Sequence, residues 1–292
     1  MTMSKRASGV LWGIAGIVAA LGLWEGYKWL GPDDGVMIGD LIVLPRTTDI
    51  AMPHTWDVVA RLFEPVTRAE GADVLWWAVL QAAAFSLGIA ALGWLIGVTF
   101  GLALALLMQR WITAESAVLP WVVLSQTVPL IAIAPLVKRW GSEITIGSFQ
   151  WENWMSVAVI ASYLAFFPVA VSALRGLKSP EAADVDLFTA YSASWWTTLL
   201  KLRLPSSVPY LMPSLRLAAA NAVVGTVVAE VSIGLGGGIG RMIIEFAATA
   251  SGDPAKTYAP ILGAVLIGLV SAGLVALIGV GLRRYMRGEV PA

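Results

Sequence analysis

Long apolar segments without charge alternate with short polar stretches along most of the chain. A helix needs about 20 predominantly apolar residues to cross a bilayer core of about 30 Å, and several segments reach that length. In lipid every backbone N–H and C=O must be paired within the protein, so these segments are expected to be helices. The pattern predicts an all-α polytopic membrane protein, a single transmembrane domain over residues 1–292, with six spans at about 8–29, 86–108, 117–137, 154–174, 208–231 and 259–282.

Two of these segments depart from a simple span. Residues 74–109 carry no charge, and as one helix they would extend about 54 Å, well beyond the bilayer core. Two complete spans and a turn would not fit, so we expect an interfacial segment led by Trp76 and Trp77 that continues into one span. The third segment contains three prolines that interrupt its helix, namely Pro120, Pro129 and Pro135.

The region before the second span has its own pattern. Lys5-Arg6 precedes a charge-free run that resembles a signal peptide in its basic lead. The run is long enough to span and no A-x-A pattern follows it, so an uncleaved first helix is predicted. Prolines and glycines break residues 25–73. Within them Thr55–Phe63 fits either a short surface helix or a packed loop outside the membrane, and the packed loop is favoured.

Composition supports a membrane protein and removes several other classes. Hydrophobic residues make up 58% of the chain, charged residues 13%, and the mean hydropathy is +0.78. Soluble proteins are about one quarter charged. The net charge is zero, which removes the bulk electrostatic argument for a nucleic-acid partner. Cysteine is absent, which excludes disulfides, and the single histidine, His54, makes a zinc-type site improbable.

Positive charges near the span ends predict the orientation. Six spans place both termini on one side, and the flanks of that side hold ten basic residues, against eight in the longer opposite loops. The positive-inside rule makes the first side cytoplasmic, although Lys138-Arg139 opposes the bias. The ten residues are Lys5, Arg6, Arg110, Arg175, Lys178, Lys201, Arg203, Arg283, Arg284 and Arg287.

The stretch Asp186–Pro205, between the fourth and fifth spans, has the pattern of a docking element. Two short amphipathic patterns flank a break: one carries Leu187 and Tyr191 on a single face, and the other carries Trp195 and Leu199. Ser194 is placed to cap the second helix, and Leu204-Pro205 closes the element with a proline suited to the first turn of the next helix. The alternative is that Trp195-Trp196 anchors a helix at the membrane surface.

This stretch resembles the cytoplasmic loop of ABC-importer permeases, in which Glu-Ala-Ala is followed by three residues, Gly, nine residues, Ile, one residue and Leu-Pro. Counted back from Leu204-Pro205, Leu202 takes the Ile position, Ser192 the Gly position and Asp186-Leu187-Phe188 the Glu-Ala-Ala position. The literal Glu181-Ala182-Ala183 lies five residues out of this register. The resemblance continues through 127–136, 215–217 and 227–230, covers roughly half of the chain, and is nearest to the nitrate, sulfonate, taurine and pyrimidine-precursor permeases.

Two residues depart from the family pattern. Ser192 replaces a glycine suited to a left-handed turn, so the turn is expected to be shaped differently or to carry strain. Asp186 shortens the acidic side chain, which would loosen a contact to the partner.

The resemblance implies a type I importer in the bacterial inner membrane. Two permeases, identical or paralogous, would form the pore, with two ATP-binding-cassette ATPases on the cytoplasmic side and an extracytoplasmic solute-binding protein opposite. ATP and Mg would bind the ATPases, leaving this chain without a cofactor or a catalytic residue. Closure of the ATPases would move the coupling loop 186–204 as a lever and switch the pore from inward- to outward-facing. The implied docking residues are Asp186, Leu187, Phe188, Tyr191, Ser192, Ala193, Ser194 and Trp195.

The glycine run Gly234–Gly240 does not change this picture. It fits neither G-x-G-x-x-G nor G-x-x-x-x-G-K-[ST], and no Gly-Lys pair occurs in the chain. A flexible turn or re-entrant edge is the favoured interpretation, so we expect no ATP hydrolysis by this chain alone.

Polar residues within the spans are the pore candidates. Arg216 and Glu230 are the two charges of the fifth span, and their separation of about 21 Å along one helix prevents them from pairing. Arg216 fits either an internal bond or snorkelling to the interface, whereas Glu230 is expected at the outer mouth. For the uncharged candidates, interhelical hydrogen bonding is the alternative. The full set is Gln126, Thr127, Asn221, Thr226, Arg216 and Glu230.

Two other function classes fit less well. An ion-coupled secondary transporter, the remaining alternative, should show inverted repeats and several titratable groups at mid-membrane, and neither is visible. An intramembrane enzyme should present paired carboxylates, a nucleophile–base pair or a metal cluster. The pore candidates include no ring of basic groups to select an oxyanion, so specificity is expected in the binding protein. On the resemblance of residues 127–136, an uncharged pyrimidine-like vitamin precursor is favoured over nitrate or sulfonate.

Overall fold

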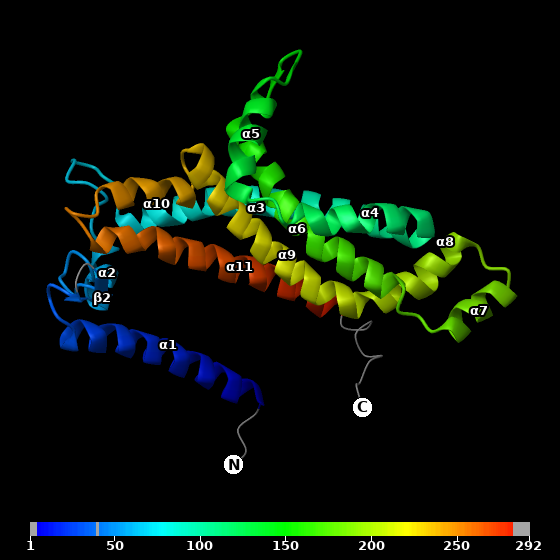
Figure 1. The fold of residues 1–292 in the computed structure, drawn as a ribbon, viewed down its shortest axis with the longest axis horizontal. Coiled ribbons are helices and arrows are strands. Elements are labelled where there is room, and N and C mark those ends of the chain that lie inside the picture. Colours follow the sequence, from blue (N-terminus) through cyan, green and yellow to red (C-terminus); the bar gives the residue numbers. More distant parts are fainter. Residues whose placement is uncertain (1–4, 39–40, 283–292) are drawn as a thin grey trace. The chain divides into compact units, whose positions relative to one another are not determined.

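The computed structural model describes residues 5–38 and 41–282, and these are mostly helical, with two short strand pairs (Figure 1). Arg283, Arg284 and Arg287 of the predicted cytoplasmic flank lie outside the described residues. Within the described part, four helices are long and apolar enough to cross a membrane, or five if one bent pair forms a broken span. The chain is therefore an all-α polytopic membrane protein. The four are Leu75–Arg110, Asn153–Leu177, Trp195–Ile233 and Ala255–Gly281.

The chain divides into two compact units, which are described separately. The first comprises Met1–Val79 and Ile243–Leu262, and the second comprises Leu80–Met242 and Gly263–Ala292. The first unit contains the 26-residue helix α1, an antiparallel strand pair and two short helices. Their bounds are α1 Lys5–Leu30, β1 Val36–Ile38, β2 Leu41–Leu44, α2 Thr55–Arg61 and the 3-10 helix η2 Ala255–Tyr258.

The end of α1 holds the loops of this first unit in place. The indole N–H of Trp24 donates to the Pro53 carbonyl at 3.1 Å, and its ring meets Tyr258 edge-on at 5.9 Å. Lys28 pairs with Asp49 at 2.7 Å, which holds the pKa of that exposed carboxyl below its usual value. These bonds join segments far apart in sequence.

The helix α2 corrects the preference for a packed loop at residues 55–63. No side chain of the local sequence caps it, since the residue at its N-cap, His54, forms no capping bond. The capping acceptor is instead Glu25 of α1, which accepts the Thr55 N–H and hydroxyl, each at 2.7 Å. Because this partner lies 30 residues away, no local pattern could reveal it.

In the second unit, α3 (Leu75–Arg110) and α6 (Asn153–Leu177) are in close contact. Gly93, Gly97 and Gly101 form a G-x-x-x-G-x-x-x-G stripe on α3. A Cβ at each of them would lie 2.5–2.7 Å from α6 atoms, so only glycine permits this approach. The predicted interfacial segment before residue 86 belongs to the same continuous helix α3.

Helix α9 (Leu204–Ile233) packs along α6 and runs beside it in Figure 1. The contact buries small residues of both helices, among them Ala161, Ala165 and Ala218, with no exposed surface. In a membrane such small residues allow close backbone approach and gain dispersion contacts where lipid offers no hydrophobic driving force. The pair is therefore the frame on which the remaining helices are placed.

The predicted third span is divided into two helices, α4 (Ile112–Ser125) and α5 (Leu130–Ser142), bent by 104°. The break lies at residues 126–129, where Pro129 is the N-cap of α5. Proline removes a backbone donor, and the residue before it is disfavoured in the α region, so α4 ends before Pro129 and α5 begins after it. The hairpin of β3 (Thr145–Ile146) and β4 (Phe149–Gln150) follows α5.

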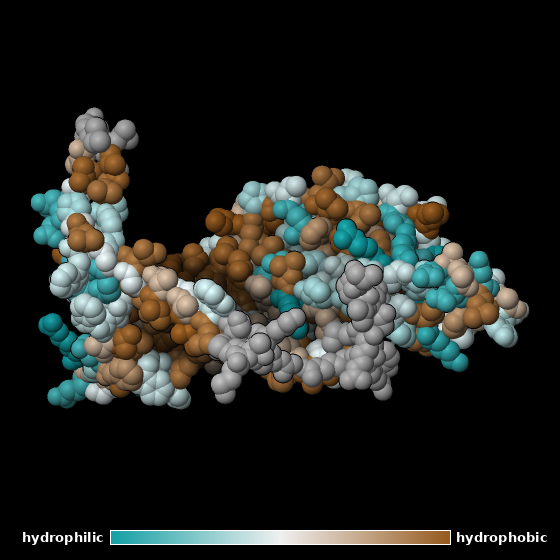
Figure 2. Space-filling view, turned by 90° about the horizontal axis from the view of Figure 1, so that it is seen from below, coloured by the Kyte–Doolittle hydropathy of each residue, from teal (hydrophilic) through white to brown (hydrophobic). Residues whose placement is uncertain are grey.

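Two more helices complete the described part of the chain, α10 (Ile239–Ala248) and α11 (Ala259–Gly281). Many large apolar side chains of the spans are exposed, including Leu217, Leu269 and Leu277. Figure 2 shows hydrophobic side chains over much of the visible face. Such surfaces are typical of helices that contact lipid or neighbouring subunits.

Candidate coupling and translocation site

The predicted docking element consists of two short helices joined by a tight turn, at one end of α6 and α9 (Figure 1). The first is α7 (Ala182–Ala190) and the second is α8 (Trp195–Thr198). Ser194 is the N-cap of α8, and its hydroxyl oxygen accepts the Thr197 N–H at 3.2 Å, which confirms the predicted cap. The Ala193 N–H donates to the Phe188 carbonyl at 2.9 Å and closes the turn.

The turn contains a backbone conformation that serine rarely adopts. Ser192 has φ = 51°, and among the described residues it is the only non-glycine residue with positive φ. This is the position at which the permease pattern has glycine, the residue that takes left-handed conformations without steric cost. A serine there retains the glycine geometry at a cost of about 1 kcal/mol or more, in line with the predicted strain.

Helix α7 presents its side chains to the exterior. None of its residues is buried, Leu187 is 53% exposed, and Tyr191 just beyond it is 80% exposed. Phe188 is half-buried and Asp186 is exposed. An exposed apolar and aromatic surface of this kind, bordered by an acidic residue, is suited to a protein partner.

Trp195 joins this surface to the bundle. Its ring packs against the buried cluster that contains Met108, Leu177 and Leu199, and the Arg110 guanidinium lies 4.9 Å from the ring centroid. The neighbouring Trp196 is 65% exposed. The two tryptophans therefore have different surroundings, one packed into the protein and the other free to contact a partner or lipid.

The connection from α8 into α9 is helical throughout but changes type. Leu199–Arg203 form a π-helix, η1, and α9 follows directly with Pro205 at its start, as predicted for this proline. Arg203 donates to the Leu177 carbonyl of α6 at 3.2 Å. π-Helical turns inside longer helices are rare and occur frequently at functional sites. Displacement of α7 would therefore reach α9 through this segment.

Three polar atoms near this joint are buried without a hydrogen-bond partner among the described residues. They are Gln109 Oε1, Trp195 Nε1 and Arg203 Nε. Such atoms are uncommon in a native structure, and each costs about 1–3 kcal/mol relative to a bonded state. Sequence reasoning missed Gln109 and Arg203, because nothing in a sequence indicates that a polar atom lacks a partner.

The pore candidates lie in several different surroundings. Gln126 and Thr127 lie at the break between α4 and α5, where Gln126 is half-buried and Thr127 is exposed. Asn221 donates its side-chain N–H to the Leu164 carbonyl of α6 at 3.2 Å, an interhelical bond of the kind foreseen as its alternative role. Thr226 is buried, and Arg216 is exposed without a hydrogen bond or ion pair within the described part of the chain.

Glu230 has the most complete set of partners in this group. Its side chain has no exposed surface, and it accepts the Ser86 hydroxyl of α3 and the Gly240 N–H of α10 at 2.7–2.9 Å. The Ile239 N–H donates to the Ser86 oxygen at 2.9 Å. In this conformation the carboxylate joins three helices instead of lining an exposed surface, and a role at the outer mouth stays a prediction.

The glycine run Gly234–Gly240 packs closely against the Glu230 carboxylate. A Cβ at Gly238 would lie 2.3 Å from the Glu230 carboxylate, and one at Gly240 would lie 2.6 Å from the Glu230 Cβ. Gly234 ends α9 in the left-handed conformation, with φ = 68°. The run is thus a defined turn that lets the N-terminus of α10 approach a buried anion. Sequence reasoning foresaw the turn but missed Ser86 and the close approach.

Comparison with known proteins identifies the class. Residues 97–285 match the family described as binding-protein-dependent transport system inner membrane component. The formylaminopyrimidine transport permease protein ThiX of Halalkalibacterium halodurans is 34% identical over 238 residues, 80% of this chain and 82% of the relative. The nitrate import permease protein NrtB of Leptolyngbya laminosa is 27% identical, over 77% of this chain and 74% of that protein.

A third relative is named for transport of a different kind of solute. The putative aliphatic sulfonates transport permease protein SsuC of Bacillus subtilis is 28% identical over 65% of this chain and 64% of the relative. The chain belongs to the binding-protein-dependent transport system inner membrane component family and is a type I ABC-importer permease of the group that includes these relatives.

Proposed function

We propose that the chain forms the translocation pore of an ABC importer for a small polar solute delivered by an extracytoplasmic binding protein. Two separate ATPase subunits bind and hydrolyse ATP with Mg, and a second permease, identical or paralogous, completes the pore. Both termini and the coupling loop 186–204 face the cytoplasm. Family membership supports the class of transporter.

The surface of α7 carries the coupling part of this proposal. Leu187 and Tyr191 are exposed although they are apolar and aromatic, and the left-handed Ser192 lies in the turn that joins α7 to α8. A short helix with apolar anchors fits a groove on a partner, where few residues supply most of the affinity. The contact surface also includes Asp186, Phe188, Ala193 and Ser194. Trp195 connects this surface to the helix bundle.

Movement of α7 has a direct route into the bundle. Trp195 and Leu199 are packed in one cluster with Met108 and Leu177, so a force on α8 acts on α3 and α6 as well as on α9. The π-helix η1 lies at this joint. We propose that it absorbs the change of angle as α9 moves, and that Gln126, Thr127, Asn221, Thr226, Arg216 and Glu230 line or border the pathway in at least one state.

For the solute, a pyrimidine-like vitamin precursor is proposed first and a nitrate- or sulfonate-type anion second. The relative named for formylaminopyrimidine transport supports the first, with 34% identity over most of both chains. The relatives named for nitrate and aliphatic sulfonates support the second. Mass spectrometry of the ligand that copurifies with the cognate binding protein would decide between them, and a ligand of neither class would refute both.

The docking proposal is tested by introducing a charge on the apolar surface of α7. We expect Leu187→Glu to abolish copurification of the ATPase and solute uptake while the variant still inserts and purifies as a folded subunit, because a carboxylate cannot fill an apolar groove. Ile146→Glu is the matched control, since Ile146 is 72% exposed in the β3–β4 hairpin, far from α7 in sequence. Normal copurification and uptake with Leu187→Glu would refute the docking assignment.

A further inference from the structure

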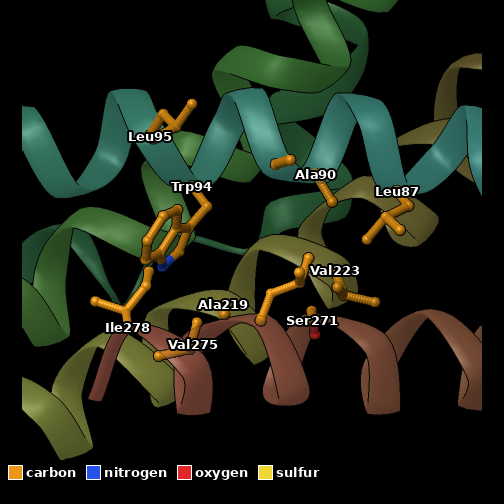
Figure 3. Close-up of a pocket in the computed structure, with 11 residues that line it drawn as sticks. Leu87, Ala90, Trp94, Leu95, Ala219, Val223, Ser271, Val275 and Ile278 are labelled. Atoms are coloured by element: carbon orange, nitrogen blue, oxygen red, sulfur yellow. The ribbon is translucent and has the colours of Figure 1, made fainter. Parts of the chain in front are cut away.

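A cavity of about 150 Å³ lies between α3, α9 and α11, all within the second unit (Figure 3). Leu87, Ala90 and Trp94 line it from α3, Ala219 and Val223 from α9, and Val275 from α11. Its lining is almost wholly apolar. Ser271, which also borders it, lies near the middle of the span α11.

The few polar groups at this cavity are already bonded elsewhere. The Ser271 hydroxyl donates to the Gly268 carbonyl of its own helix at 2.8 Å. The Trp94 indole N–H donates to the Leu215 carbonyl of α9 at 3.1 Å. A buried water needs two to four polar partners, and an apolar cavity of about this size stays dry and accepts small apolar ligands. The cavity therefore favours a hydrocarbon occupant over water.

The cavity is continuous with the apolar surface of the spans. Leu95 and Leu274 both line it and are 54% and 51% exposed, so it opens between α3 and α11. These helices are membrane spans of high apolarity, and α11 has few buried residues. In a bilayer the apolar molecule present at this depth and at high concentration is the acyl chain of a lipid.

We propose that this cavity is a binding site for the acyl chain of a membrane phospholipid, which enters laterally between α3 and α11. The acyl chain of the lipid packs against the face of α9 formed by Ala219 and Val223, beside the hydrogen bond from the Trp94 indole to the Leu215 carbonyl. The site thus contacts α9, the span that follows the docking element directly in the chain. This inference is independent of the solute and of the ATPase contact.

The test uses the purified membrane protein in nanodiscs that contain a phospholipid with a photoactivatable diazirine at the end of one acyl chain. We expect irradiation to label the cavity residues of α3 and α11 more strongly than Ala84 and Ala272, which are exposed on the same helices but do not line the cavity. When the protein is irradiated only after exchange into detergent, the cavity residues should still be labelled, because a bound lipid remains in the site. Equal labelling of both sets would mean surrounding bulk lipid only and would refute the site.

Filling the cavity provides the matched variants. Ala90→Leu combined with Ala219→Leu should lower labelling of the cavity residues about tenfold, because added side chains occupy the space. Ala84→Leu combined with Ala220→Leu makes the same chemical change at exposed positions outside the cavity and should leave labelling unchanged. If the buried double variant does not fold, Ala91→Leu fills the cavity from an exposed position and should give the same loss. Unchanged labelling in a folded filling variant would refute the proposal.

Another segment of the same chain is the competing occupant, and disulfide trapping tests it. The chain has no cysteine, so Ile278→Cys paired with Ile17→Cys of α1 reports their proximity cleanly. We expect no disulfide. Efficient formation of this disulfide, together with absent lipid labelling, would show that α1 fills the site and would overturn the lipid assignment.

Discussion

The charged side chains at the two ends of α9 differ in their bonding, although Thr226 Oγ1, one turn from Glu230, is also buried without a partner among the described residues. At the C-terminal end, the Glu230 carboxylate, the Ser86 hydroxyl and the first amides of α10 satisfy one another completely. At the N-terminal end, Arg203 Nε and the nearby Trp195 Nε1 are buried with no hydrogen-bond partner among residues 5–38 and 41–282, and the backbone is π-helical.

The network at Glu230 has its hydrogen bonds formed, whereas the region around Arg203 contains buried polar atoms that could still form hydrogen bonds. A fully bonded buried network has one favourable arrangement, because any displacement leaves polar groups unpaired in a low dielectric. Buried atoms without partners instead raise the energy of the observed state and favour any movement that pairs them. We therefore expect α9 to be anchored at Glu230 and to change shape near Leu199–Arg203, beside the docking element.

The largest expected effect is at the anchored end. Glu230→Ala should lower the free energy of unfolding by about 3 kcal/mol or more, because Ser86 and the Gly240 N–H lose a charged acceptor in a buried site. Thermal unfolding of the purified protein in detergent measures this, with Glu230→Gln as the conservative variant of smaller effect. If Glu230→Ala melts with the wild type, the carboxylate does not hold these helices together.

The next effect tests the shape of the glycine turn. Gly240→Ala should destabilise by about 1–3 kcal/mol, since the new Cβ would lie 2.6 Å from Glu230 and 2.6 Å from a backbone carbonyl of α9. Gly236→Ala is the matched control, with no atom within 4 Å of the new Cβ and no left-handed φ. Equal melting temperatures for the two variants would contradict the close approach.

At the other end, stability and function should separate. Gln109→Met removes a buried oxygen that has no hydrogen-bond partner within the described part of the chain, and it keeps a similar side-chain volume. The free energy of unfolding should therefore stay within about 1 kcal/mol of wild type or rise. Solute uptake per ATP hydrolysed should fall if the oxygen is paired in another state of the cycle. Unchanged uptake per ATP in reconstituted vesicles would show that the unpaired atom has no part in coupling.

The smallest effect is expected at the turn of the docking element. Ser192→Gly should relieve left-handed strain and stabilise the 182–198 segment by about 1 kcal/mol. Hydrogen exchange of the amides in this segment is the measurement, because the change is local. Faster exchange in the glycine variant would mean that the serine hydroxyl stabilises the turn more than its conformation costs.

The sequence predicted a structural feature correctly where all the residues that form the feature lie close together in the chain. The cap of α8 follows from Ser194 and the N–H three residues on, and the left-handed turn follows from the position of Ser192 in the pattern. Of the three prolines predicted to interrupt the third segment, only Pro129 lies at the break, whereas Pro120 and Pro135 lie inside the helices α4 and α5, which corrects that part of the prediction. The bend of 104° depends on how α5 packs against α6 and α9, which no local pattern specifies.

The sequence by itself determined the membrane class and most of the helical elements, because apolar length and backbone pairing in lipid leave few other structures. The tertiary structure alone decided which helices meet and which polar groups are paired. Ser86 and Glu230 lie 144 residues apart, and Glu25 caps a helix 30 residues away. The physical reason is that helix formation is a local property, whereas the pairing of a buried charge depends on atoms that only folding brings together.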